Sequence, residues 1–213
     1  MKTDELIGLL ATGIEAVEPH LAERRYAKAI AAGMAGAGMM MLSLLQVRAD
    51  LAEAALSMMF WIKLGFVGAL LLAGAFASIR FSRPGARVNS VPAFIGLPVL
   101  VMWCLAVFAL ITADADQRMD LLLGKTWSVC PFLIATLSIP VFVAVIWAMK
   151  GLAPTNLRQA GFSAGLLSGA TAALVYCLHC PESSAPFIGL WYSLGILIPA
   201  IFGASVGRRL LQW

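Results

Sequence analysis

The sequence predicts an all-α integral membrane protein, a bundle of six transmembrane helices with both termini in the cytoplasm. Of its 213 residues, 61% are hydrophobic and only 12% are charged, whereas soluble domains are roughly 45–50% apolar and about 25% charged. A globule of this size with so little charge cannot present a wetted surface. The bilayer must therefore serve as the solvent for most of the chain.

Six apolar stretches are the second observation behind this fold class. Each is close to the roughly 20 residues that a helix needs to cross the hydrocarbon. Backbone groups in lipid must bond internally, and no stretch alternates as a barrel strand would, so each is predicted to be a helix. The predicted spans cover residues 27–47, 58–79, 91–111, 129–149, 161–178 and 186–206. They divide the chain into a cytoplasmic N-terminal segment, residues 1–26, and a transmembrane domain, residues 27–213.

The placement of lysine and arginine predicts the orientation. One face has only Arg48, Arg118 and Lys125, and by the positive-inside rule the richer face is cytoplasmic. The remaining base, Lys63, lies about one turn inside the second span, and we expect it to snorkel to the external boundary. The bases on the cytoplasmic side are Lys2, Arg24, Arg25, Lys28, Arg80, Arg83, Arg87, Lys150, Arg158, Arg208 and Arg209.

Regularly spaced glycines predict how the helices pack. Gly161, Gly165 and Gly169 form one ridge on the fifth span, and Gly203 and Gly207 repeat the spacing on the sixth. Small residues let helix backbones approach closely in lipid, so these glycines indicate packing within the bundle. The spans contain almost no charge, which argues against a transporter with an ion or proton pathway.

Three of the four cysteines are predicted to lie at the external surface. Cys130 opens the fourth span, and Cys177 and Cys180 close the fifth. A bridge between Cys130 and Cys180 would tie the fourth span to the loop between the fifth and sixth spans, and disulfides persist outside a bacterial inner membrane. Together with His179, these thiols offer soft ligands to a thiophilic metal. Redox or metal sensing is predicted, and the alternative is inert buried thiols or a plain stabilising disulfide.

The N-terminal segment is predicted to form an acidic amphipathic helix. Interfacial membrane helices favour a polar face rich in lysine and arginine, so this helix is better suited to a basic or apolar groove on a soluble partner. A solvated tail, or packing on the bundle, is the alternative. Its apolar face carries Leu6, Leu9, Leu10, Ile14 and Val17, and its acids are Asp4, Glu5, Glu15 and Glu18.

With these residues in hand, the chain resembles the NrsF family of membrane anti-sigma factors. The resemblance rests on the opening Met-Lys-Thr-Asp-Glu-Leu-Ile, the six-span layout, Cys130, and the His-Cys-Pro-Glu block at 179–182 that is followed by Trp191 and Tyr192. It implies a multi-pass protein of the bacterial inner membrane that regulates transcription in a stress response. Such a protein sequesters an extracytoplasmic-function sigma factor and releases it when external cysteines sense heavy metals or oxidants.

The resemblance also implies which residues act. Cys130 and Cys180 would be the sensor pair, with Cys177 and His179 as secondary candidates, and a metal would bind Cys130, Cys180 and His179. The role requires no catalysis, no cofactor and no direct contact with nucleic acid. The implied sigma-factor contacts are Asp4, Glu5, Leu6, Leu9 and Leu10.

The enzyme alternative is a membrane thiol oxidoreductase that passes electrons from an external dithiol to quinone. Such an enzyme would use two cooperating cysteine pairs in external loops. This chain supplies one Cys-x-x-Cys and the single Cys130. The sequence leaves open which sigma factor is bound, whether Cys130 and Cys180 are bridged at rest, and the oligomeric state.

Overall fold

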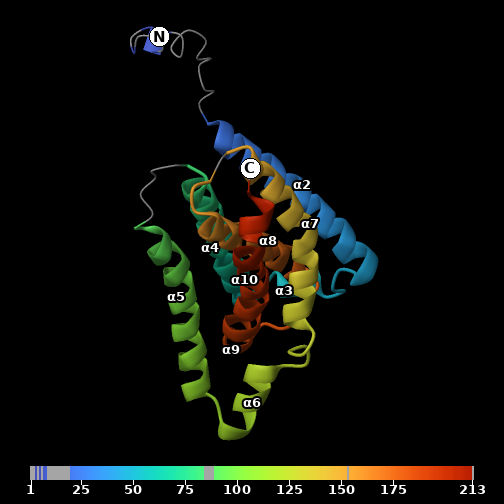
Figure 1. Cartoon of the computed structure of the whole chain (residues 1–213). Helices are drawn as coiled ribbons and strands as arrows, with labels where there is room; N and C mark the ends of the chain where they lie inside the picture. The colour runs from blue at the N-terminus through green and yellow to red at the C-terminus, as the bar shows by residue number, and fades with distance from the viewer. Residues whose placement is uncertain are drawn as a thin grey trace.

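The computed structural model describes residues 3, 5, 7–8, 20–83, 89–152 and 154–212. Every regular element within these ranges is helical (Figure 1), so the all-α prediction is confirmed for the described residues. In chain order the elements are α2 (Leu21–Leu44), α3 (Leu51–Ala54), α4 (Met58–Phe81), α5 (Val91–Thr112), α6 (Ala115–Leu123), α7 (Cys130–Lys150), α8 (Leu157–Tyr176), α9 (Ala185–Phe187), the π-helical turn η1 (Ile188–Tyr192) and α10 (Ser193–Leu210).

Five described stretches are long and apolar enough to cross a membrane, and each matches a predicted span. The sixth predicted span, residues 161–178, falls on α8, whose glycine, alanine and serine content makes it less apolar. With 20 residues α8 is long enough to cross, but the six-span count stays a prediction. The five stretches are Leu21–Leu44, Met58–Phe81, Val91–Thr112, Cys130–Lys150 and Ala185–Leu210.

Helix α8 lies at the centre of the bundle, with α4, α7 and α10 packed around it (Figure 1). Fifteen of its 20 residues are buried. A helix enclosed by other helices has no need of an apolar outer face, which explains why its composition differs from that of the outer spans.

The glycine ridge on α8 packs against α10, as the sequence predicts. A Cβ atom added at Gly161 would collide with the carbonyl of Gly203, and one at Gly165 would collide with the carbonyl of Pro199. At Gly169 the nearest backbone atom is the Cα of Ile196, 2.9 Å away. The two backbones are therefore in direct contact, and the prediction that these glycines serve bundle packing is confirmed.

Helix α5 lies at the edge of the bundle (Figure 1) and packs on it mainly through α4 and α9. Only Val91, Met102 and Ala106 of α5 are buried, and large apolar side chains such as Leu97, Phe108 and Ile111 are exposed. In a membrane these side chains would face lipid.

The helix boundaries depart from the predicted spans at two places. α2 begins at Leu21, six residues before the predicted span, so residues 21–26 of the predicted N-terminal segment belong to the same helix. The loop between α5 and α7 contains α6, a nine-residue helix that the span analysis does not predict. The start of α2 and the end of α10 lie at the same end of the bundle (Figure 1).

Candidate functional site

The predicted sensor thiols lie together at one end of the bundle. Cys130 is the first residue of α7, and Cys177 and Cys180 follow the end of α8. All three are free thiols with no exposed surface, whereas Cys104 on α5 is exposed. Reagents in solution therefore reach the three thiols only if the surrounding chain moves.

Cys130 and Cys180 are buried neighbours whose side chains interact electrostatically. The hydroxyl of Tyr176, on the last turn of α8, contacts both thiols. The hydrogen bond from Cys130 and then the nearby charge of Lys63 lower the pKa of the Cys180 thiol, against the opposing effect of burial. The structure thus brings the two family-implied cysteines together and makes Cys180 the more acidic thiol of the pair.

Lys63 is completely buried and does not snorkel, so that expectation is wrong. Its Nζ donates to the backbone carbonyls of Cys180 and Glu182, at 3.0 Å each. Nζ also lies 5.0 Å from the centroid of the Tyr192 ring. These partners replace the water that a snorkelling lysine would reach, because carbonyl dipoles and an aromatic face both favour a cation.

The segment that carries Cys180, residues 177–184, is here called the thiol loop. The loop after α2, the helix α6 and the connection between α6 and α7 hold it in addition to Lys63. The backbone N–H of Arg48 donates to the carbonyl of Leu178 at 3.1 Å, and its guanidinium donates to the carbonyl of Cys180 at 3.3 Å. From the other side, the backbone N–H of Lys125 donates to the carboxylate of Glu182 at 2.8 Å, and the hydroxyl of Ser184 donates to the carbonyl of Leu121 at 2.7 Å.

Gly124 lets the α6–α7 connection approach the thiol loop closely. Its φ angle is 54°, in the left-handed region that glycine tolerates best. A Cβ atom there would lie 2.8 Å from the carboxylate of Glu182 and 2.9 Å from the ring of Phe187. Any larger residue would push this connection away from the thiol loop.

The polar contact of His179 is with the loop that follows α2. Its Nδ1 lies 2.8 Å from the carbonyl of Gln46, and its ring centroid is 5.6 Å from that of Tyr176. Among the described residues, no three His, Cys, Asp or Glu side chains are grouped closely enough to hold a metal ion. The pair Cys130 and Cys180 is assembled, but the three-residue metal site with His179 is not formed in this conformation and stays a prediction.

The opposite end of the bundle anchors the N-terminal segment. The hydroxyl of Tyr26, a buried residue of α2, donates to the carbonyl of Ser78 at 3.3 Å and shares a 2.6 Å hydrogen bond with the hydroxyl of Ser82. Arg83 also pairs with Glu23. The start of α2 is thereby fixed to the end of α4.

Most of the predicted sigma-factor contacts lie outside the described residues, namely Asp4, Leu6, Leu9 and Leu10. Glu5 is described, and it is helical and exposed. The role of all five residues therefore stays a prediction.

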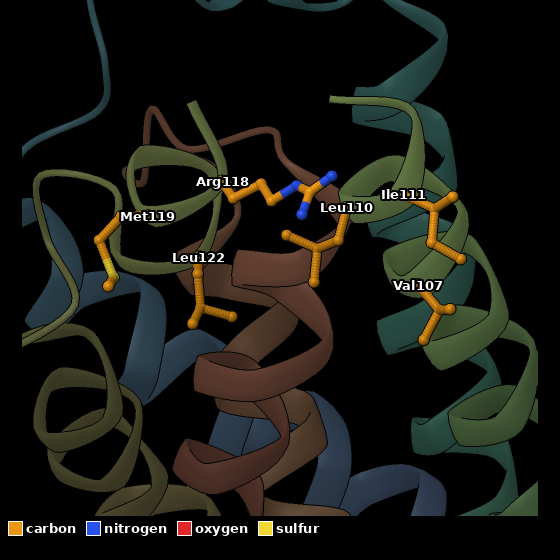
Figure 2. A pocket seen from close by; sticks show the side chains of 6 residues that line it. All are labelled: Val107, Leu110, Ile111, Arg118, Met119 and Leu122. Atoms are coloured by element: carbon orange, nitrogen blue, oxygen red, sulfur yellow. The ribbon is translucent and has the colours of Figure 1, made fainter. Parts of the chain in front are cut away.

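A pocket of about 410 Å³ lies between α5 and α6, away from the thiols. Figure 2 shows its lining of Val107, Leu110 and Ile111 from α5, facing side chains of α6. Arg118 is the charged member of the lining, and its Nε donates to the carbonyl of Ala113 at 3.2 Å. The apolar lining offers no group for chemistry, so we place the candidate site at the thiols.

The contacts of Lys63 with the thiol loop were not predictable from the sequence. Its partners lie 117 and 119 residues further along the chain, and both are backbone carbonyls, which any residue type supplies. The one available signal was the lysine itself, a charged residue inside an apolar span.

Comparison with known proteins places the chain in context. The family model described as "Negative regulator of sigma F" matches residues 10–213. The chain is 58% identical to the probable anti-sigma-F factor NrsF of Azospira oryzae and 40% identical to the anti-sigma-F factor NrsF of Caulobacter vibrioides. Both alignments cover all of this chain and all of the relative. No solved structure matches the chain.

Proposed function

Because the chain belongs to the NrsF family, the negative regulators of sigma F, we propose that it is a membrane-bound anti-sigma factor with an external thiol sensor. At rest, its N-terminal segment holds an extracytoplasmic-function sigma factor on the cytoplasmic side of the bacterial inner membrane. A heavy metal or an oxidant that reacts with Cys130 and Cys180 changes the bundle, and the sigma factor is released. The names of the family and of both relatives describe regulation, which favours this role over the thiol oxidoreductase.

The contact between Cys130 and Cys180 is the observation that carries the sensor half of the proposal. The two thiols come from different helix ends, the start of α7 and the loop after α8, so a covalent bond or a shared metal would join two elements. A disulfide requires two cysteines that lie close together, so the placing of these two thiols side by side in the core favours a role as a sensor pair.

The energy available from the thiols sets the size of the response. Moving a two-state equilibrium from 1:99 to 99:1 takes about 5.5 kcal/mol, and a disulfide typically contributes about 2–4 kcal/mol. Reaction of the thiol pair therefore shifts the balance between holding and releasing the sigma factor substantially. It completes the switch only if the resting state is already close to balance.

The proposal is tested with a transcriptional reporter that depends on the sigma factor. Replacing both Cys130 and Cys180 with serine should abolish induction by cadmium or diamide, because no bridge or two-thiol metal site can form. Cys104→Ser, on the exposed face of α5, is the matched control and should respond normally. Normal induction in the double variant would overturn the sensor half.

The anti-sigma half has a separate readout. The sigma factor should co-purify with the solubilised full-length protein and be lost when residues 1–20 are deleted. Retention of the sigma factor by the truncated protein would contradict the assignment of binding to the N-terminal segment.

A further inference from the structure

Lys63 combines complete burial with an unusual set of partners. In the described part of the chain it is the only charged residue that the fold buries completely. Removing a cation from water is strongly unfavourable unless polar groups replace its hydration. Its hydrogen-bond partners are two backbone carbonyls of the thiol loop, those of Cys180 and Glu182. Because the buried ammonium group of Lys63 binds one short loop, we infer that Lys63 has a role at that loop.

The backbone on the two sides of Cys180 is held in different ways. On its N-terminal side, the backbone N–H of Cys180 donates to the carbonyl of Tyr176 at 3.0 Å, which continues the last turn of α8. On its C-terminal side comes Pro181, which has no N–H to donate and cannot extend that turn. The carbonyls on either side of Pro181 are the backbone groups nearest to it that can fix this part of the loop, and Lys63 binds both.

From this geometry we propose that Lys63 is the positioning residue of the thiol pair: by holding the carbonyls of Cys180 and Glu182, it keeps the Cys180 sulfur against Cys130. The inference rests on the proposed sensor role of the two cysteines and concerns how readily they react with each other. Because Lys63 belongs to α4, the position of the thiol loop is also tied to that helix. Arg48 contributes one weaker contact to the same carbonyl of Cys180, at 3.3 Å, from the rim of the site.

Positioning matters because bridging two thiols is geometrically demanding. The Cα atoms of a disulfide lie about 4.4–6.8 Å apart, with a restricted dihedral angle. In the reaction with diamide, the two thiols lose two protons and two electrons, one S–S bond forms, and diamide is reduced to its hydrazine. Reactions between groups held in place proceed faster than those between groups that move freely. Loss of the two hydrogen bonds from Lys63 should therefore slow formation of the disulfide.

The test follows formation of the Cys130–Cys180 disulfide in the purified, reduced full-length protein without any sigma factor. Diamide is added, samples are quenched by alkylation, and the bridged peptide is quantified by mass spectrometry. Lys63→Met should slow bridging by about tenfold or more, the scale expected when charge-assisted hydrogen bonds are lost. Lys125→Met is the matched control, since its exposed side chain is changed while its backbone contact with Glu182 remains.

Alkylation rates separate positioning from a general structural role. In Lys63→Met, Cys180 should become more reactive toward iodoacetamide while Cys130 and Cys177 stay protected, because only the loop is released. Lys63→Gln retains N–H donors at this place and should show a smaller loss of bridging rate. It also serves as the working variant if Lys63→Met does not purify as a folded protein.

The proposal would be overturned by an unchanged or faster bridging rate in the Lys63 variants, or by equal exposure of all three buried thiols. Its failure is distinguishable from failure of the sensor function, which is decided by the response of the Cys130 and Cys180 serine variant in the reporter assay. The bridging assay contains no sigma factor and depends on the thiols alone.

Discussion

Two cations hold the thiol loop, and their surroundings differ. Lys63 approaches from inside the bundle with no exposed surface, whereas Arg48 lies at the rim and forms an ion pair with Asp50 at 2.6 Å. The carboxylate of Asp50 accepts from both Nε and Nη2 of the guanidinium. This two-point contact fixes the orientation of Arg48 and so supports its weaker bond to the carbonyl of Cys180.

The Arg48–Asp50 pair predicts a specific pH dependence. Hydrogen bonds from Arg48 lower the pKa of Asp50 from 3.8 to about 2. A carboxyl with a lowered pKa stabilises the folded state fully above its unfolded pKa, and this contribution is lost as the pH falls through about 2. A ¹³C NMR titration of the Asp50 carboxyl should give a midpoint near 2, and Arg48→Gln should return it toward 3.8. An ordinary midpoint in the unmodified protein would show that the pair does not persist in solution.

At the scale of helices, the contact between α8 and α10 depends on the absence of side chains. The backbones meet at Gly161 and Gly165, where even a methyl group has no room. In lipid, burial of apolar surface does not favour contact between helices, so the van der Waals contacts of closely packed backbones stabilise the pair instead. The central position of α8 is therefore built from its smallest residues.

Gly165→Ala should destabilise the bundle markedly. The added Cβ would lie against the backbone of Pro199 and 2.6 Å from the Cα of Ala200, so the two helices must move apart. We expect a loss of about 2–3 kcal/mol, the upper range for overpacking. The measurement is the free energy of unfolding in detergent.

Gly68→Ala on α4 is the matched control for Gly165→Ala. Nothing lies within 4 Å of a Cβ atom at that position. The substitution should be neutral or stabilising by up to about 1 kcal/mol, since alanine favours the helix over glycine. Equal losses at the two positions would mean that the α8–α10 contact is not the source of the effect.

For the molecule as a whole, the membrane-crossing helices were predictable because apolar length is a local property of the sequence. The predicted span 91–111 matches α5 to within one residue. The small helix α6 was not predicted, because its residues are of mixed polarity and too few for a span. The place of α5 at the edge of the bundle depends on distant contacts, which no single apolar stretch encodes.

The candidate site was predictable in part for the same reason. The cysteines stand at the ends of predicted spans, so their shared face follows from topology. The segments around the thiols are held by residues whose signal in the sequence is weak: Gly124, whose φ is positive, and Gln46, whose carbonyl lies 2.8 Å from Nδ1 of His179. Contacts made through backbone groups leave no pattern of side chains to find.

The number of spans has a direct topological consequence that can be measured. If α8 crosses the membrane, the C-terminus lies on the same side as the N-terminus; if it does not, they lie on opposite sides. Green fluorescent protein fused after residue 213 should be fluorescent, and alkaline phosphatase at the same position should be inactive. Phosphatase placed within α6 should be active, because that loop is predicted to be external. Phosphatase activity at the C-terminus would contradict the six-span prediction.

Near one end of α4, Lys63 binds the thiol loop. Near its other end, Ser78 and the residue that follows the helix, Ser82, bind Tyr26 at the start of α2. One rigid element thus borders both proposed sites, and equilibrium coupling between two sites is reciprocal. If reaction of the thiols weakens the hold on the sigma factor by some factor, a bound sigma factor must disfavour reaction of the thiols by that same factor. Under the proposed function, the loaded protein is then harder to trigger than the empty one, and the supply of sigma factor itself sets the threshold for stress.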